Sequence, residues 1–345
     1  MSNCPILWFC AKHGAPIPWH SWRRRPGTRM AAGPGMVLVR RGLYLGGAEA
    51  GSAPGALEAA GVLALLSVDV EEPAPPPPGV WTLHVAARDE PGADLLSHLD
   101  TCVAFLAAAR AAGRAALVRC HAGRSRSAAV VAAYLMKSEG LRFTEAYAAV
   151  RAVRPEAQMN AGFVWQLELY EAMGCRVDAS SALYKCYRLQ RLAQQHPELQ
   201  GLPREVFAVD PTNTCPASNN EALYRCRKCR RSLFHSSSIL THAEGSGPAA
   251  FAHKRIKDPA QRRNDGQDKC SSFFIEPVQW MEPALLGVME GQLLCPKCTL
   301  KLGSFSWHGG QCSCGRWVTP AFQIHKSRVD GIQALPIGGF QTVKT

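Results

Sequence analysis

The stretch from Leu117 to Ser127 places the tightest constraint on how this chain can fold. Ala115 to Val118 form an apolar run of strand length, and apolar residues recur at helical spacing from Ser127 to Gly140. The loop between them is short and consists mostly of small residues. We therefore expect a buried strand, a tight loop and the N-terminus of a helix in direct succession.

This loop can bind an anion and present a nucleophile to it. Its backbone N–H groups can converge at the helix N-terminus, where the helix dipole favours negative charge. Cys120 would there exist largely as a thiolate, and the guanidinium of Arg126 can bind two phosphate oxygens. Cys-x5-Arg alone is a weak signal, but the flanking strand and helix make it specific. The predicted phosphate-binding residues are His121, Ala122, Gly123, Arg124, Ser125 and Arg126.

The segment from Arg119 to Ser127 resembles the signature loop of the cysteine-dependent dual-specificity protein phosphatases, which typically ends in Ser-Arg-Ser. A second pattern from the end of that fold is matched by Asn160, Phe163, Gln166 and Leu167. The resemblance covers about residues 36 to 174. The family usually has His before the nucleophile, where this chain has Arg119. An extra cation there could favour the thiolate further or loosen the loop, and the sequence leaves both open.

The residues around the loop predict an α/β fold. Val62 to Val68 is a continuous apolar run typical of a strand buried on both faces, and Trp81 to Val85 reads as another strand. An acidic loop and a helix ending at Gly113 follow. Two more helices are expected at 144–153 and 160–173, the second capped by Asn160. The alternation predicts a central sheet flanked by helices, as in the cysteine-dependent phosphatase fold.

Phosphoryl transfer needs a nucleophile, charge stabilisation and a proton donor. Cys120 is the predicted nucleophile, and Arg126 with the loop amides would stabilise the phosphate oxygens. Ser127 could hydrogen-bond the cysteine sulfur and make it a better leaving group. Asp89 is the predicted general acid, because the family carries its acid on the corresponding loop. Glu90 and Asp94 are rivals, although Asp94 also fits an ordinary helix cap. This chemistry requires no metal.

The length and composition of the chain indicate how many domains it contains and what kind of partner it has. A chain of 345 residues favours two domains, and its net charge of +12 suits phosphorylated, nucleic-acid or acidic partners. No apolar run reaches the roughly 18 residues of a membrane span, so no membrane partner is expected. We expect a disordered leader over 1–35, the phosphatase domain over 36–174, a connector over 175–220 and a zinc-binding domain over 221–345.

The last segment predicts two metal sites. Among the chain's 14 cysteines, seven lie between 221 and 345, and the N-terminus lacks the basic start of a secretory signal. Cys-x-x-Cys pairs let two thiolates reach one tetrahedral zinc ion, so we expect two structural zinc ions. The cysteine ligands are Cys226, Cys229, Cys270, Cys295, Cys298, Cys312 and Cys314. His242 is the favoured eighth ligand, with His253 and His325 behind it.

This cysteine spacing, with the phrases Phe251-Ala252-His253-Lys254 and Cys314-Gly315-Arg316-Trp317, resembles the tail of the zinc-binding atypical dual-specificity phosphatases. The resemblance implies a β-rich zinc-binding tail, a role in maturation of the large ribosomal subunit, and residence in nucleus and cytoplasm. Pre-ribosomal particles or RNA would then be partners beside a phosphoprotein substrate. Basic residues crowd the first cysteine pair and could contact RNA phosphates, or simply form a solvated cationic face: Arg225, Arg227, Lys228, Arg230 and Arg231.

Three functions remain open from the sequence. The first is a protein phosphatase acting on phosphotyrosine and on phosphoserine or phosphothreonine, with the zinc module as an accessory. The second is a largely non-catalytic ribosome-assembly or RNA-binding factor. The third is a phosphatase of phosphoinositides or RNA 5′-phosphates, to which the cationic Arg124 would be suited, although the Ser-Arg-Ser ending favours protein substrates.

Overall fold

The computed structural model describes residues 35–51, 55–72, 78–195, 202–213, 221–242, 244–245 and 270–332. The leader expected over residues 1–35 therefore lies outside the described residues except for its last residue. His253, considered above as a metal ligand, lies outside them as well.

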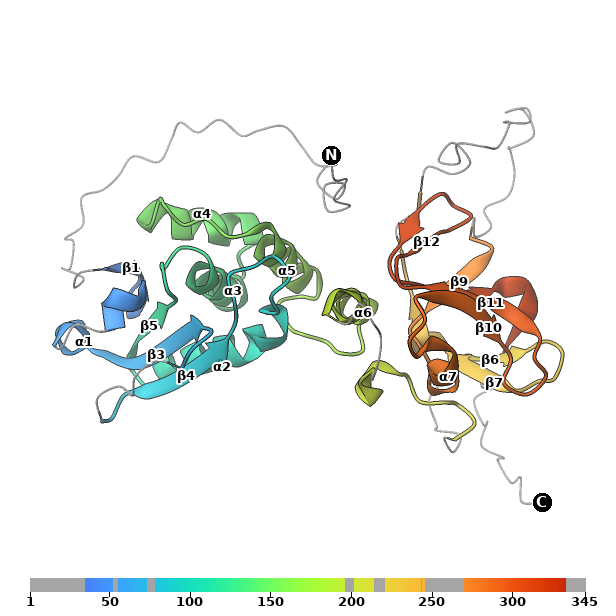
Figure 1. Ribbon diagram of the computed structural model, residues 1–345. Helices are drawn as coiled ribbons and strands as arrows, with labels where there is room; N and C mark the ends of the chain where they lie inside the picture. Colours follow the sequence, from blue (N-terminus) through green and yellow to red (C-terminus); the bar gives the residue numbers. More distant parts are fainter. Residues whose placement is uncertain are drawn as a thin grey trace, which may run out of the picture. The chain divides into compact units, whose positions relative to one another are not determined.

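A five-stranded sheet forms the centre of the first domain (Figure 1). Its strands are β1 (Met36–Arg40), β2 (Leu43–Gly46), β3 (Val62–Asp69), β4 (Trp81–Ala86) and β5 (Ala115–Arg119). The order is β1-β2-β5-β3-β4, and only β1 and β2 run antiparallel. Because β5 is the middle strand, the loop that follows it emerges at the carboxyl edge of the parallel strands, where α/β proteins bind ligands.

Helices complete this domain. They are α1 (Ala56–Ala59), α2 (Leu96–Ala111), α3 (Arg126–Glu139), α4 (Phe143–Val153) and α5 (Ala161–Ala172). The helix α3 contacts β2, β3 and β5 as well as α2, α4 and α5, and all its side chains from Arg126 to Met136 are buried. It ends at Gly140 in the left-handed conformation, as the sequence predicts. The loop after β5 is thus held between a buried strand and a buried helix.

The expected connector contributes to packing. The helix α6 (Ala182–Gln195) lies within it. Tyr187 of α6 joins the core of the phosphatase domain, whereas Leu192, Leu202 and Phe207 join a second core. The described residues 202–213 contain a short 3-10 turn and an isolated bridge between Ala208 and Val278. Leu202 and Phe207 in this stretch are nevertheless buried, whereas Val209 is exposed.

The C-terminal domain consists mainly of short strands. They are β6 (Leu223–Cys226), β7 (Ser232–His235), β8 (Ile239–Leu240), β9 (Ser272–Ile275), β10 (Glu290–Leu294), β11 (Lys301–Ser306), β12 (Gly310–Gln311), β13 (Trp317–Val318), β14 (Ala321–His325) and β15 (Val329–Ile332), with one short helix, α7 (Glu282–Leu285). They form sheets ordered β10-β11-β14-β9-β8, β15-β6-β7 and β12-β13. The expected fold class, a central sheet flanked by helices followed by a β-rich domain, is confirmed.

Across the described ranges, no helix has both the length and the apolar character needed to cross a bilayer.

Candidate active site and metal-binding clusters

Cys120 lies directly after β5, with its side chain buried at the base of the loop. Its sulfur is 3.1 Å from the hydroxyl oxygen of Ser127 and accepts a hydrogen bond from the backbone N–H of Gly123 at 3.2 Å. Ser127 stands in the first turn of α3. Two donors and a helix N-terminus therefore stabilise negative charge on this sulfur.

The loop has its tight shape because two backbone segments touch. Gly123 has a φ of 65°, and a Cβ at this position would lie 2.5 Å from the carbonyl carbon of Gly46 at the end of β2. Any other residue would collide with this strand and strain its own backbone. The backbone N–H of Ala48 donates to the carbonyl oxygen of His121 at 2.9 Å. The loop is thus fixed against the end of β2.

The guanidinium of Arg126 is held by two hydrogen bonds, while its buried Nε makes none among the described residues. Its Nη1 donates to Asp69 Oδ1 at 2.8 Å and to the carbonyl oxygen of Ala87 at 3.1 Å. The Nε of this 6 % exposed residue is buried and makes no hydrogen bond within the described part of the chain. A buried donor without an acceptor is costly, and an anion in the loop would supply the acceptor.

Asp69, which holds Arg126, was not singled out from the sequence. Burial raises the pKa of Asp69, but hydrogen bonds from Arg126 and the Val70 N–H outweigh that effect, and the net pKa is below the ordinary value. Asp69 is therefore a carboxylate at neutral pH and keeps the guanidinium of Arg126 in a fixed orientation. A single acidic residue at the end of a strand gives no sequence signal for such a role.

Asp89 is the one predicted acid that faces the loop. It lies between β4 and α2, and its Oδ1 accepts hydrogen bonds from Ser125 Oγ at 2.7 Å and from Asn160 Nδ2 at 2.9 Å. Its Oδ2 is 3.7 Å from Arg126 Nε. The carboxyl group is thus next to both the phosphate-binding loop and the arginine.

The two rival acids are engaged elsewhere. Asp94 accepts a hydrogen bond from the Ser97 N–H at 3.1 Å in the first turn of α2, as expected of a helix cap, and another from the Tyr187 hydroxyl at 2.7 Å. Glu90 is exposed and lies 3.8 Å from Arg88. Among the three candidates, the geometry favours Asp89.

Arg119 occupies the position where the family usually has His. Its side chain hydrogen-bonds to the elements on both sides of the strand before the loop. Its Nε donates to Ser67 Oγ on β3 at 2.9 Å, and its Nη1 donates to the carbonyl oxygen of Ala48 at 3.3 Å. Burial lowers the pKa of Arg119, and the nearby carboxylate of Asp69 opposes this shift. Arg119 therefore connects β5 to elements on both of its sides, which steadies the base of the loop.

The other loop residues differ in exposure. Ser125 is buried and bonded to Asp89, whereas the side chains of His121, Ala122 and Arg124 are exposed. The backbone also ties the loop to the segment before α5, because the Gln158 N–H donates to the carbonyl oxygen of Arg124 at 3.0 Å. An exposed cation at position 124 adds positive charge to the rim of the site.

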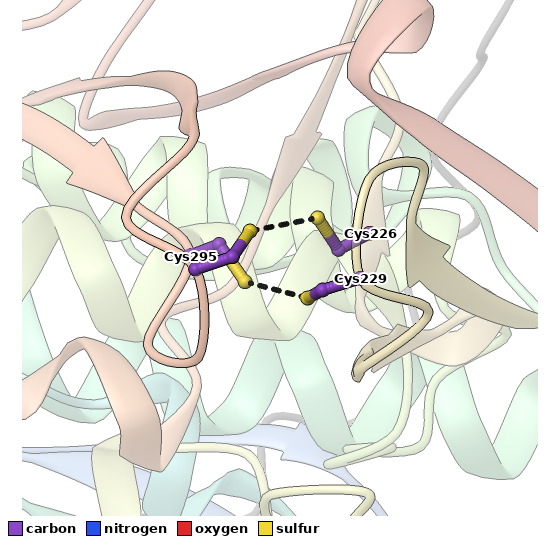
Figure 2. Close-up of side chains that lie close together, drawn as sticks. Cys226, Cys229 and Cys295 are labelled. Carbon is purple, nitrogen blue, oxygen red and sulfur yellow. Dashed lines mark hydrogen bonds between the residues drawn. The ribbon is translucent and has the colours of Figure 1, made fainter.

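The C-terminal domain brings the first four predicted metal ligands together. Cys226, Cys229, Cys295 and Cys298 have all their sulfur atoms within 4.8 Å of one another. The sulfur atoms of Cys229 and Cys295 are 3.5 Å apart, and those of Cys226 and Cys298 are 3.7 Å apart. Figure 2 shows the sulfur atoms of Cys226, Cys229 and Cys295 directed toward one another.

These thiols fit a metal ion better than a set of disulfides. Their separations far exceed an S–S bond and are close to the edge of about 3.8 Å expected for a tetrahedral ZnS4 centre. Burial and the neighbouring thiols raise the pKa of Cys295 to about 12, because a thiolate there lacks compensating charge. A divalent cation would supply that charge.

The second cluster contains His242, Cys270, Cys312 and Cys314, whose ligand atoms also lie within 4.8 Å of one another. His242 Nε2 is 3.5 Å from the sulfur atoms of both Cys270 and Cys314. Burial and the charge of Arg316 lower the pKa of His242, which keeps its imidazole neutral and able to bind a metal. His325, the lower-ranked candidate, instead lies 3.1 Å from the Ser272 hydroxyl. Each cluster could hold one metal ion.

The basic residues near the first cysteine pair are partly neutralised. Arg227 and Arg230 both form ion pairs with Asp330, and Arg231 pairs with the buried Asp210. The positive charge at this surface is therefore smaller than the sequence suggests. Arg227, Lys228 and Arg230 are nevertheless exposed. The single carboxylate of Asp330 pairs with both Arg227 and Arg230, so positive charge remains at this surface.

Several known proteins are similar to this chain. A family model described as "Dual specificity phosphatase, catalytic domain" matches residues 43–173. Dual specificity protein phosphatase 12 of Homo sapiens is 59% identical over 321 residues, which cover 92% of this chain and 94% of the human protein. The protein of the same name from Rattus norvegicus is 59% identical over 327 residues, which cover 93% of this chain and 96% of the rat protein. The crystal structure of human DUSP28 is 44% identical with a TM-score of 0.40, and the match covers 41% of this chain and 97% of that one.

The matched catalytic domain makes this protein a hydrolase of the dual specificity protein phosphatase class. The similarity continues through the cysteine-rich tail, and the chain belongs to the dual specificity protein phosphatase 12 family.

Proposed function

We propose that the protein hydrolyses phosphotyrosine and phosphoserine or phosphothreonine through a cysteinyl-phosphate intermediate. The observation that carries this proposal is the arrangement around Cys120: its sulfur lies 3.1 Å from the Ser127 hydroxyl and accepts from the Gly123 N–H, while the buried Nε of Arg126 makes no hydrogen bond within the described residues. The loop therefore offers a stabilised nucleophile and an unused cationic donor for phosphate.

The first step transfers the phosphoryl group to the enzyme. The Cys120 thiolate attacks phosphorus, the bond between phosphorus and the substrate oxygen breaks, and the protonated carboxyl of Asp89 gives its proton to that leaving oxygen. Arg126 and the loop N–H groups bind the phosphate oxygens as charge develops on them. Asp69 maintains the orientation of Arg126 during this step.

The second step releases phosphate. The Asp89 carboxylate takes a proton from water, the water oxygen attacks phosphorus, and the bond between sulfur and phosphorus breaks. The hydrogen bond from Ser127 stabilises the departing Cys120 thiolate. Both groups then return to the states in which they began.

The test is a panel of phosphotyrosine, phosphoserine and phosphothreonine peptides, phosphoinositides and RNA 5′-phosphates, assayed with wild type and Cys120→Ser. We expect turnover of the phosphopeptides by wild type alone. Preferred turnover of the lipid or RNA substrates would replace the proposed substrate class with the alternative that the exposed Arg124 favours. Turnover of phosphopeptides by Cys120→Ser at the wild-type rate would contradict the cysteine mechanism.

We also propose that the two clusters bind zinc and that the C-terminal domain acts in maturation of the large ribosomal subunit. Zinc would supply folding energy to the tail and no catalytic group. The donor sets, four cysteines in one cluster and three cysteines with one histidine in the other, support zinc. The exposed Arg227, Lys228 and Arg230 support a contact with RNA phosphate groups.

This role would place the protein in the nucleus and cytoplasm. Co-sedimentation of the full chain with large-subunit precursor particles tests it. We expect binding that weakens with rising salt, and no co-sedimentation at low salt would contradict the role.

A further inference from the structure

Contacts from α5 and its N-cap hold the loop that carries Asp89 at three places. The loop leads from β4 to α2, and its position decides where the Asp89 carboxyl points. Gln166, which is 2 % exposed, accepts hydrogen bonds from the backbone N–H groups of Leu95 and Leu96, each at 2.8 Å. Its amide nitrogen donates to the carbonyl oxygen of Ala93 at 2.8 Å. Gln166 therefore fixes the end of the loop nearest α2.

The middle of the loop touches α5 directly. A Cβ placed on Gly162 would lie 1.9 Å from the carbonyl oxygen of Pro91. The helix approaches this closely only because residue 162 has no side chain. The loop therefore rests against the first turn of α5.

Asn160 makes the contact that reaches the acid itself. Its Oδ1 accepts a hydrogen bond from the Phe163 N–H at 3.0 Å and so caps α5. Capping fixes the amide group, and its Nδ2 donates to Asp89 Oδ1 at 2.9 Å. The opposite amide orientation would direct an oxygen at the Asp89 carboxylate and remove the cap, so the network assigns this orientation.

The two oxygens of Asp89 consequently have different surroundings. Oδ1 accepts from both Ser125 and Asn160, whereas Oδ2 lies 3.7 Å from Arg126 Nε at the phosphate-binding loop. An oxygen that already accepts two hydrogen bonds is a poor place for a proton. The proton that Asp89 transfers is therefore best carried on Oδ2, the oxygen on the side of Arg126.

We propose that Asn160 is a positioning residue for the general acid: its amide binds Asp89 Oδ1 and leaves Oδ2 to carry the proton to the leaving group. This inference rests on the proposed phosphatase function. Asn160 acts through Asp89 and touches no reacting atom. Its removal should slow the reactions that need a proton donor and leave the others nearly unchanged.

Asn160→Ser tests the proposal with little risk to the fold. Serine is as good a helix cap as asparagine, but its side chain is too short to reach Asp89. The full-length variant would be assayed with phenyl phosphate, whose leaving group needs protonation, and with p-nitrophenyl phosphate, whose leaving group needs it much less. We expect kcat/KM to fall about tenfold for phenyl phosphate, a fraction of the usual contribution of a general acid, and to change less than about twofold for p-nitrophenyl phosphate.

Two controls separate positioning from folding. Glu168→Gln changes the same helix away from the acid loop and should leave both rates and the melting temperature unchanged. In an Asp89→Ala background, Asn160→Ser should cause no further loss, because the group that it positions is gone. Equal losses for both substrates, or a further loss in that background, would overturn the proposal.

The same experiment separates this inference from the proposed function. If Asp89→Ala itself fails to slow phenyl phosphate more than p-nitrophenyl phosphate, the assignment of the acid is wrong. If Asp89→Ala shows that selective loss and Asn160→Ser does not, only the positioning role of Asn160 is wrong.

Discussion

Single residues around the signature loop show how tertiary contacts complete a motif. The motif itself indicates Cys120 and Arg126, because a nucleophile and a guanidinium at this spacing have few other uses between a strand and a helix. Around them, Asp69 of β3 binds Arg126, Ser67 of β3 binds Arg119, and Asn160 at the start of α5 binds Asp89. Asp69 and Ser67 carry no local signature, and the pattern containing Asn160 indicates a family without saying what its members contact. Their roles emerge only when the strands and helices are assembled.

The ion pair between Asp69 and Arg126 should make stability depend on pH. The folded protein lowers the pKa of Asp69, because the bonds from Arg126 and the Val70 N–H outweigh burial. Its contribution to stability is therefore present above the ordinary aspartate pKa of about 3.9 and is lost as the pH falls through the lower folded value. We expect wild type to be more stable than Asp69→Asn at pH 7, with the gap closing below about pH 4.

Urea unfolding of the two full-length proteins at a series of pH values measures this gap. Acid removes bound metal from both proteins alike, so that effect cancels in the comparison. A gap that stays constant down to pH 3 would show that Asp69 stabilises the fold through packing rather than through its charge.

The arrangement of strands and turns determines which cysteines lie in the same cluster. The spacing of the pairs predicts metal ligands but leaves their pairing open. In the structure, the turns after β6 and β10 carry the four cysteines of one cluster, while the turn between β12 and β13 joins Cys270 and His242 in the other. Strands of two to six residues give little periodicity, so this arrangement of sheets could not be read from the sequence. The α/β domain was easier to predict, because its buried strands and amphipathic helices are longer.

Two separate clusters predict an additive zinc content. Purified wild type should contain about two zinc ions per chain, whereas Cys229→Ser and Cys312→Ser should each retain about one, because each variant loses one ligand set. Elemental analysis measures this directly. Cys186→Ser, which changes a cysteine outside both clusters, is the matched control and should retain two. Two ions in both cluster variants, or none in wild type with its thiols oxidised, would contradict the assignment.

At the scale of the whole molecule, the described residues form two large hydrophobic cores, beside a smaller cluster around Cys312 and Cys314. One contains the central sheet, α3 and Tyr187, and the other contains the strands around the first metal cluster together with Leu192, Leu202 and Phe207. A division into two domains follows from the sequence because the α/β pattern stops near Gly174 and the cysteine pairs begin at Cys226. The burial of Leu202 and Phe207 in the intervening segment does not follow from the sequence, because these residues belong to no helical or strand period.

Separate cores predict that damage to one domain spares the other. Cys295→Ser removes a ligand from the first cluster and should unfold part of the tail, with loss of co-sedimentation with large-subunit precursor particles. Phosphopeptide turnover should persist in this variant, because its active site lies in the other core. Cys120→Ser should show the reverse, full particle binding without turnover. Loss of both properties in either variant would mean that the two domains depend on each other.

The proposed catalytic role of Cys120 is tested most directly by trapping the intermediate. Full-length enzyme would be mixed with a phosphotyrosine peptide, quenched in acid within milliseconds and digested for mass spectrometry. Asp89→Ala and Cys120→Ser would be treated in the same way. We expect a phosphoryl group on the peptide containing Cys120 in wild type and none in Cys120→Ser. In Asp89→Ala, the phosphorylated Cys120 should form more slowly and persist longer, because both steps lack their proton-transfer group. Release of phosphate by wild type without any phosphorylated Cys120, at quench times that span the first turnover, would contradict the mechanism.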